Sequence, residues 1–307
     1  MKWKTQFFLR KYRMCFMNKE LKVKIIKNAN LKDFCTFKIG GSADFAFVVE
    51  NTYSLIKFCK VCKEIGVRFK VIGLGANLLF SDDGFNGGII VNRSNSIKFK
   101  GKSVFADSGV HVSSLIQKCI TRNLGGIENL MGIPATIGGA VVNSLSAFNT
   151  NFTDFVEHVI CYDIENDKII KLTAKECEFG YRTSVFKHNN LVVLQVKLKL
   201  NHCNALTIEE NAVNAVQRKK LSQPLNMPSA GSVFKRGEDF IPSLIIDKLG
   251  LKGERIGDAQ ISTKHAGFIV NLGSATAEDV KKLIDYIKND VRSSTRNELE
   301  TEIEFVD

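Results

Sequence analysis

Several separated segments of the sequence carry side chains that could take part in chemistry. Residues 180–186 read Gly-Tyr-Arg-Thr-Ser-Val-Phe, and Arg182 offers a planar fork of N–H donors that suits a carboxylate or a phosphate. Residues 229–236 read Ser-Ala-Gly-Ser-Val-Phe-Lys-Arg, so a rigid turn could present the hydroxyl of Ser232 as a proton donor. Because residue 234 is not glycine, the segment does not match the nucleophile elbow of hydrolases. A surface arginine and a turn serine are the plain alternatives.

The last fifty residues add further charged groups. Lys264 and His265 directly precede an apolar run at 266–271, so two side chains that can donate hydrogen bonds lie at the start of an expected strand. Acidic residues alternate near the C-terminus, at Glu298, Glu300, Glu302 and Glu304. A solvated strand edge is the expected role for three of these four.

Two segments rich in small residues suggest close approach of the backbone to a ligand. Residues 71–77 read Val-Ile-Gly-Leu-Gly-Ala-Asn, so a strand runs into two glycines. The third glycine of a dinucleotide-binding fingerprint is absent, because residue 78 is leucine, and a standard Rossmann fold is therefore not expected. Residues 132–142 could form a nest of N–H groups for a pyrophosphate. A tight turn and a glycine-rich helix contact are the alternatives, but two such loops together favour a bound dinucleotide.

Composition places the chain among folded proteins of ordinary character. It has 307 residues, 44% of them hydrophobic and 24% charged, which suggests two domains or one large one and excludes wholesale disorder. There are 43 Lys and Arg against 32 Asp and Glu, a net charge of +11. Such a balance suits a nucleic acid, a membrane surface or an anionic small substrate, or simply a basic cytosolic protein.

Cysteine usage and the N-terminus point to a reducing compartment. Eight cysteines stand in a long chain without a secretory signal, because basic residues interrupt the apolar run of residues 1–17. Cys59 and Cys62 form one C-x-x-C pair inside a helical pattern, so packing in a core is expected rather than zinc binding. No metal-ligand spacing appears, no apolar run reaches the length of a membrane span, and a cytoplasmic location is expected. Residues 1–16 are expected to be a loose, dispensable extension.

Periodicity predicts elements that alternate irregularly. Apolar residues at helical spacing predict helices around 55–62, 112–119 and 280–291, the last capped by Thr276, and Pro242 opens a short helix that stops at Gly250. Eight strands are predicted, at 43–49, 68–72, 88–91, 103–106, 156–163, 191–200, 266–271 and 302–306. This order favours an α+β fold over a regular βαβ series. The polar stretch 201–207 is the expected domain junction.

Taken together, these segments resemble the UDP-N-acetylenolpyruvoylglucosamine reductase (MurB) family. The resemblance covers about residues 28–307, and its motifs are specific as an ordered set. They are Phe-Lys-Ile-Gly-Gly at 37–41, the loops at 73–77 and 132–140, Tyr-Arg-Thr-Ser at 181–184, Gly-Ser-Val-Phe at 231–234, Ser-Thr-Lys-His-Ala-Gly-Phe at 262–268 and Glu-Ile-Glu-Phe at 302–305.

The resemblance implies an FAD-binding domain of the vanillyl-alcohol-oxidase (PCMH) type at 28–200 and a smaller α+β substrate domain at 201–307, after a lead-in at 1–27. It also implies a two-step reaction in peptidoglycan precursor synthesis, in which NADPH reduces non-covalently bound FAD and the enolpyruvyl group of UDP-N-acetylglucosamine enolpyruvate is then reduced to give UDP-N-acetylmuramate. A monomer with only small-molecule partners, and no nucleic acid, is expected.

The resemblance also implies roles for individual residues. Arg182, Ser232 and Glu302 take the family's catalytic positions, as holder of the substrate carboxylate, proton donor and assisting acid. The implied cofactor-binding residues are Gly73, Gly75, Ala76, Asn77, Leu78, Gly132, Pro134, Ala135, Thr136, Gly138 and Gly139. The implied substrate-binding residues are Lys220, Arg236, Lys264 and His265.

The sequence departs from the family pattern in places. Where the family usually has Asn-Ala-Gly, residues 143–147 read Asn-Ser-Leu-Ser-Ala, and we expect Leu145 and Ser146 to restrict φ there. The short distance from Arg182 to Ser232 leaves no room for a tyrosine-bearing insertion, so the chain resembles the shorter subclass. An FAD-linked oxidase that uses oxygen and a basic nucleic-acid-binding protein remain the competing hypotheses.

Overall fold

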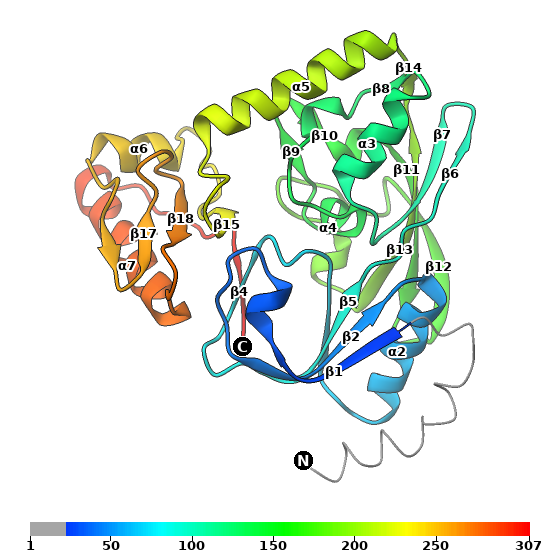
Figure 1. Cartoon of the computed structure of the whole chain (residues 1–307), viewed down its shortest axis with the longest axis horizontal. Helices are drawn as coiled ribbons and strands as arrows, with labels where there is room; N and C mark the ends of the chain where they lie inside the picture. The colour runs from blue at the N-terminus through cyan, green and yellow to red at the C-terminus, as the bar shows by residue number, and fades with distance from the viewer. Residues whose placement is uncertain (1–22) are drawn as a thin grey trace. The chain divides into compact units, whose positions relative to one another are not determined.

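The computed structural model describes residues 23–307 of the chain, and Figure 1 shows its helices and strands. The predicted residues 1–16 extension, and the lead-in as far as residue 22, lie outside the described residues. The fold is α+β, as predicted. Contacts divide the chain into two compact units that are built from separated segments. Unit 1 holds the described residues up to Lys27 with Asp44–Gly73 and Gly87–Val213, and unit 2 holds Asn28–Ala43, Leu74–Asn86 and Asn214–Asp307.

A five-stranded antiparallel sheet forms the centre of unit 1. Its order is β12-β11-β13-β7-β6. Its strands are β6 (Ile97–Lys100), β7 (Ser103–Asp107), β11 (Val156–Asp163), β12 (Lys168–Thr173) and β13 (Leu191–Lys199). Alternation decides which face is buried, since Val196 and Leu198 lie in the core while Lys197 and Lys199 point the other way.

Helices α3 (Val112–Ile120) and α4 (Ile137–Val142) supply apolar side chains to the core of this sheet. The predicted face of α3 is buried as a set, comprising Val112, Leu115, Ile116 and Cys119. The spacing of apolar residues in the sequence therefore located α3 correctly, because these four side chains share one side of the helix.

A second apolar cluster of unit 1 surrounds α2 (Thr52–Glu64), whose N-cap Asn51 accepts a hydrogen bond of 2.7 Å from the Ser54 N–H. Cys59 and Cys62 are buried there with Phe47 and are free thiols, so the predicted core role is confirmed. Burial raises the pKa of the Cys62 thiol to about 12. The neighbouring sheet has the order β1-β2-β5-β3. Its strands are β1 (Val23–Asn30), β2 (Ser42–Val49), β3 (Phe69–Ile72) and β5 (Phe85–Asn92).

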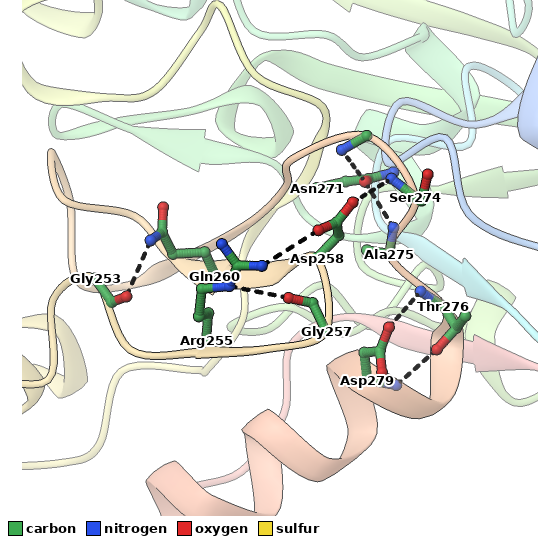
Figure 2. Close-up of polar contacts among 11 residues, drawn as sticks. Gly253, Arg255, Gly257, Asp258, Gln260, Asn271, Ser274, Ala275, Thr276 and Asp279 are labelled. Carbon is green, nitrogen blue, oxygen red and sulfur yellow. Dashed lines mark hydrogen bonds and ion pairs between the residues drawn. The ribbon is translucent and has the colours of Figure 1, made fainter.

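Unit 2 is a four-stranded sheet with helices α6 (Pro242–Lys248) and α7 (Ala277–Thr295). The sheet order is β15-β18-β17-β16. Its strands are β15 (Ser229–Ser232), β16 (Arg255–Ile256), β17 (Ala259–Ile261) and β18 (Phe268–Asn271). The N-terminus of α7 is fixed by a capping box between Thr276 and Asp279 (Figure 2), so the predicted N-cap is confirmed.

Asn271 at the end of β18 holds the segment that leads into α7 (Figure 2). Its side-chain oxygen accepts hydrogen bonds from the N–H groups of Gly273 and Ala275, at 2.8 and 3.0 Å. Its amide donates to the carbonyl of Phe37 at 3.2 Å. A buried asparagine therefore joins the first segment of unit 2 to the last one.

The remaining elements are short, apart from α5 (Ala205–Ser222), within which the chain changes unit. Strands β4 (Leu78–Phe80) and β19 (Glu304–Val306) pair in parallel. The other pairs are β8 (Leu124–Gly125) with β14 (Asn201–His202), and β9 (Ser146–Ala147) with β10 (Thr150–Asn151). The 3-10 turns are η2 (Leu31–Phe34), η3 (Glu128–Leu130), η4 (Phe152–Phe155) and η5 (Val185–Lys187).

Two predicted strands begin later than expected. The run predicted at 266–271 pairs only from Phe268, because the preceding residues form a turn in which the Ser262 hydroxyl accepts N–H bonds from Lys264 and His265. The run predicted at 302–306 forms β19 only from Glu304, since the Glu302 N–H donates instead to the carbonyl of Val233, the residue that follows β15. No helix within residues 23–307 is long and apolar enough to cross a membrane.

Candidate active site

The first small-residue loop offers unoccupied backbone donors. Gly75 has φ +62°, and a Cβ atom there would lie 2.4 Å from the carbonyl oxygen of Phe34, so only glycine fits. Among residues 23–307, no acceptor pairs with the N–H groups of Leu74, Gly75 and Ala76. Consecutive unpaired N–H groups form a concave site for an anion. The loop therefore has the donors that a phosphate of a dinucleotide needs.

The glycine that begins this loop packs against the second loop within unit 1. A Cβ on Gly73 would lie 2.4 Å from Oγ1 of Thr136. Thr136 is the N-cap of α4, and its hydroxyl accepts a hydrogen bond of 3.3 Å from the Gly139 N–H. The structure thus brings together two of the predicted cofactor-binding segments at Gly73 and Thr136.

The second loop uses its own N–H groups internally. Ile137 donates to Val110 and Gly138 to Ser108, each at 2.8 Å, so the predicted nest of free N–H groups is not what these positions provide. Gly138 is required for close packing, since a Cβ would lie 3.0 Å from the Cβ of Ser108. At Gly139, in contrast, a Cβ would meet only the Thr136 hydroxyl, at 3.5 Å. The loop contributes space for a ligand more than it contributes donors.

Arg182 lies at the tip of a tight turn in unit 1. Gly180 and Thr183 exchange backbone hydrogen bonds of 3.1 and 3.2 Å, which leaves Tyr181 and Arg182 as the two central residues. Arg182 has φ +55°, a conformation that costs a side-chain-bearing residue free energy and that clusters at functional sites. Its guanidinium carbon lies 5.7 Å from the centre of the Tyr181 ring. The fork of donors is half-buried and is held by a strained turn.

The departure from the family pattern at residues 143–147 supports this turn. The left-handed conformation falls on Ser144 (φ +43°), Phe148 and Asn149, whereas Ser146 belongs to β9, so the expected restriction at Leu145 and Ser146 was misplaced. The Ser144 hydroxyl donates to the carbonyl of Thr183 at 2.6 Å. The Ser184 hydroxyl donates back to the carbonyl of Val142 at 2.8 Å. Two serines therefore tie the Arg182 turn to the end of α4.

Ser232 and Glu302 lie on neighbouring segments of unit 2. Ser232 ends β15, directly after Gly231 with φ +80°. The Glu302 N–H donates to the carbonyl of Val233 at 2.7 Å, so the C-terminal segment runs beside the serine. The side-chain amide of Asn77 donates to the carbonyl of Glu302 at 3.0 Å. The predicted proton donor, the predicted acid and the first loop thus share one hydrogen-bonded framework, and both acidic and hydroxyl side chains are half-buried.

Two of the predicted substrate-binding cations lie together in unit 2. The Lys264 ammonium donates to the carbonyl of Lys220 in the last turn of α5, where the helix dipole favours a cation. Lys264 also lines a pocket of about 380 Å³ that combines polar and apolar walls. The other lining residues are Pro224, Asn226, Met227, Gln260, Ser262, Thr263, Val270 and Leu272.

The other two predicted substrate-binding residues have different surroundings. Burial lowers the pKa of His265, and its Nδ1 accepts a hydrogen bond of 3.1 Å from the Gly267 N–H. The ring is therefore neutral at neutral pH and offers only its Nε2–H to a ligand. Arg236 is exposed, next to Lys235, whose ammonium pairs with Glu300. The pairing with Glu300 agrees with the solvated role expected for most of the C-terminal acids.

Sequence reasoning missed one residue of this framework. Thr36 donates through its hydroxyl to the carbonyl of Ser229 at 2.7 Å, and its N–H donates to the carbonyl of Gly75 at 3.4 Å. The only signal in the sequence is its position directly before the segment 37–41. A hydrogen bond to a partner so far along the chain leaves no local pattern.

Comparisons with known proteins identify relatives of this chain. The family model "FAD binding domain" matches residues 43–173, and "UDP-N-acetylenolpyruvoylglucosamine reductase, C-terminal domain" matches 223–306. The UDP-N-acetylenolpyruvoylglucosamine reductase of Caldicellulosiruptor saccharolyticus is 39% identical over 290 residues, which is 94% of this chain and 93% of that protein. The enzyme of the same name from Thermotoga maritima is 40% identical over 272 residues, 88% of this chain and 94% of that one.

A solved structure gives the same result. The crystal structure of UDP-N-acetylenolpyruvylglucosamine reductase (MurB) from Thermus caldophilus superposes with a TM-score of 0.79 at 31% identity. It covers 94% of this chain and 100% of that chain. Because the two family models match successive parts of the sequence and the relatives match nearly all of it, the chain belongs to the UDP-N-acetylenolpyruvoylglucosamine reductase family of FAD-binding oxidoreductases.

Proposed function

We propose that this protein uses NADPH to reduce the enolpyruvyl group of UDP-N-acetylglucosamine enolpyruvate, giving UDP-N-acetylmuramate. The observation that carries the proposal is the position of Glu302, whose backbone is hydrogen-bonded to Val233 beside Ser232 and to Asn77 of the first loop. An acid, a hydroxyl and a ligand-binding loop held in one framework suit a reaction that ends with a proton transfer next to a cofactor.

The residues present fit non-covalently bound FAD. The free N–H groups at 74–76 suit its pyrophosphate, and Gly139, where an added Cβ would meet only the Thr136 hydroxyl at 3.5 Å, leaves space for a ligand beside α4. We assign cofactor contacts to Gly73, Gly75, Ala76, Asn77, Leu78, Gly132, Pro134, Ala135, Thr136, Gly138 and Gly139. When bound, FAD supplies the hydride chemistry between the nicotinamide and the enol ether.

We assign the substrate carboxylate to Arg182. Hydride arriving at C3 of the enol ether leaves negative charge at C2, which spreads into the carboxylate. A guanidinium held by the 180–183 turn can form two parallel bonds to this carboxylate, and those bonds strengthen as the charge grows. Arg182 therefore stabilises the transition state more than the ground state.

We assign the final proton transfer to Ser232, assisted by Glu302. A hydroxyl is a weak acid, but a carbanionic C2 is a strong base, so the transfer from Ser232 is downhill. Glu302 follows Thr301, which pairs with Phe234, so its backbone lies beside the segment that follows the serine. From there, it can hydrogen-bond the developing enolate or restore the proton to the hydroxyl.

The basic groups of unit 2 suit an anionic sugar nucleotide. Lys220, Lys264 and Arg236 are exposed cations, and the neutral ring of His265 can add one donor. The pocket beside Lys264 is lined by the apolar residues Val270 and Leu272 together with polar residues, a mixture that suits a ligand with a flat ring and attached phosphates. We further propose that the protein is a monomer and works in the cytoplasm. Its product would serve peptidoglycan precursor synthesis, and through it cell shape and cell division.

Anaerobic titration tests the proposal. The purified protein should be yellow, should lose its flavin absorbance when NADPH is added, and should regain it when the enolpyruvyl sugar nucleotide follows. Repeating the first step with NADH tests the choice of nicotinamide. A reduced flavin that only oxygen reoxidises would favour the oxidase hypothesis, whereas a colourless protein that does not take up added FAD would refute the proposal.

A further inference from the structure

We propose that Thr36 and Asn77 are positioning residues, which hold Ser232 and Glu302 in a fixed relation to the flavin loop at 74–77. The inference rests on the proposed function, which gives Ser232 and Glu302 their roles. It assigns to Asn77 a task besides a cofactor contact, and it gives a role to Thr36, which lies outside both the catalytic and the ligand-binding sets.

Asn77 fixes the carbonyl side of Glu302. Its side-chain N–H donates to the Glu302 carbonyl at 3.0 Å, and its own carbonyl accepts the N–H of Glu304 at 2.9 Å. The next residues then pair in parallel, with Glu304 opposite Leu78. Asn77 of the flavin loop is therefore hydrogen-bonded to both ends of the segment 302–304. A movement of the loop would break these bonds or shift this segment.

Val233 fixes the other side of the same residue. The Glu302 N–H donates to its carbonyl at 2.7 Å, and Lys235 adds a bond from its N–H to the carbonyl of Glu300 at 2.9 Å. Both peptide groups that flank the Glu302 Cα are thus hydrogen-bonded to different segments. With the backbone fixed on both sides, the direction of the Cα–Cβ bond is set, and only side-chain rotations remain to be restricted.

Thr36 fixes the strand that carries Ser232. The pairing of β15 with β18 is irregular between Ser229 and Ser232, where Gly231 has φ +80°. A strand with an irregular ladder has fewer bonds to hold it, so the 2.7 Å bond from the Thr36 hydroxyl to the Ser229 carbonyl is an anchor at its start. Since the Thr36 N–H also reaches the Gly75 carbonyl, at 3.4 Å, the same residue ties this strand to the flavin loop.

Matched substitutions at Thr36 test the role through the two half-reactions. Thr36→Val keeps the shape and removes the donor, whereas Thr36→Ser keeps the hydroxyl. We expect Thr36→Val to slow reoxidation of the reduced protein by the enolpyruvyl substrate about tenfold, and its reduction by NADPH less than about twofold, because only the second step needs the proton. Thr36→Ser should restore reoxidation. Equal losses in both steps, or a Ser variant as slow as the Val variant, would overturn the positioning role.

Asn77 is tested by hydrogen exchange, because it also lies in the flavin loop. In the FAD-loaded protein, Asn77→Asp should speed amide exchange in a peptide covering residues 299–307, since a carboxylate cannot donate to the Glu302 carbonyl. It should also shift the pH profile of reoxidation. Exchange of the α3 peptide at 112–120 serves as the control. Unchanged exchange at 299–307 would overturn the inference even if the enzyme is active. Faster exchange there, together with a wild-type protein that the substrate never reoxidises, would refute the proposed function alone.

Discussion

The hydroxyl of Ser144 donates a 2.6 Å hydrogen bond to the carbonyl of Thr183, the residue that follows Arg182. Ser144 is buried and has φ +43°. The free-energy cost of this strained backbone is offset in part by the hydrogen bond to Thr183. The Ser144 bond connects the turn to another segment of the chain, whereas the two backbone bonds between Gly180 and Thr183 lie within the turn. Residues 142–144, at the end of α4, therefore help to hold the turn that carries Arg182.

Replacing Ser144 tests this relation. Ser144→Ala should destabilise the fold by about 1 kcal/mol, because a buried hydrogen bond is lost. It should also raise the KM for the enolpyruvyl substrate severalfold, since the Arg182 turn loosens. Ser144→Asn, with a residue that tolerates positive φ and can still donate, is the matched variant and should retain the wild-type KM. Thermal unfolding and steady-state kinetics measure both effects, and a KM unchanged in Ser144→Ala would separate Ser144 from Arg182.

Gly75 gives a prediction about the cofactor. In Gly75→Ala, the new methyl group would meet the Phe34 carbonyl, so the loop must shift and the protein should lose its flavin on gel filtration. Gly101→Ala is the control, since Gly101 has a similar φ of +56° with nothing within 4 Å of an added Cβ. That variant carries only the backbone strain of roughly 1 kcal/mol and should stay yellow. Full flavin retention in Gly75→Ala would remove this loop from the cofactor site.

Arg182→Lys tests the bidentate contact. A lysine keeps the charge but cannot form two parallel bonds to a carboxylate, so kcat/KM for the enolpyruvyl substrate should fall at least tenfold, with reduction by NADPH little changed. Arg122→Lys is the matched control, because Arg122 is exposed and lies over Phe99 in another part of unit 1. Wild-type turnover in Arg182→Lys would place Arg182 outside the site.

Ser232→Ala should separate the two half-reactions. Flavin reduction by NADPH needs no proton from Ser232, so its rate should persist, while reoxidation by substrate should slow by at least about a hundredfold. Stopped-flow absorbance follows both steps, and Ser293→Ala, at an exposed serine in α7, is the control. Equal slowing of both steps in Ser232→Ala would argue against a proton-donor role.

The buried ring of His265 gives a prediction about pH. Burial lowers the pKa of His265 in the folded protein, so the unfolded chain binds more protons in the range just below the ordinary histidine pKa of about 6.5. Its neutral form therefore stabilises the fold above that pH, and the stabilisation is lost as pH falls toward the folded-state pKa. His265→Asn keeps an acceptor for the Gly267 N–H but cannot titrate, so urea unfolding between pH 7 and 5 should show a shallower loss of stability. An identical slope would assign that loss to other groups, such as His158.

Apolar periodicity and turn chemistry were sufficient to locate much of the fold. The faces of α3 and α7, the Thr276 cap and the span of β11 follow from local spacing, because each depends on residues within two or three turns of one another. The ends of β18 and β19 were predicted less well. An apolar run does not reveal that the Ser262 hydroxyl accepts the N–H of Lys264, or that the Val233 carbonyl accepts the N–H of Glu302. These bonds delay the start of strand pairing in each case.

For the candidate site, the sequence supplies residues that could do the chemistry but not the contacts that hold them. Arg182, Ser232 and Glu302 stand out through motifs, whereas the roles of Thr36 and Ser144 depend on acceptors in distant segments. The loop at 132–139 shows the reverse error. Its glycines indicated a nest of free donors, but the carbonyls of Val110 and Ser108 accept hydrogen bonds from two of these N–H groups. The sequence alone does not reveal these acceptors, because they lie in another segment.

The interleaving of the two units has a consequence for biosynthesis. Phe37 and Ile39 belong to the apolar core that α7 and Ile303 complete, so these two residues are synthesised before most of the side chains that cover them. Unit 2 therefore does not fold during synthesis as an independent C-terminal domain, and a fragment starting at residue 214 would expose the surface that those early residues cover. We therefore expect the apolar surface of Phe37 and Ile39 to stay exposed during synthesis until α7 has been made.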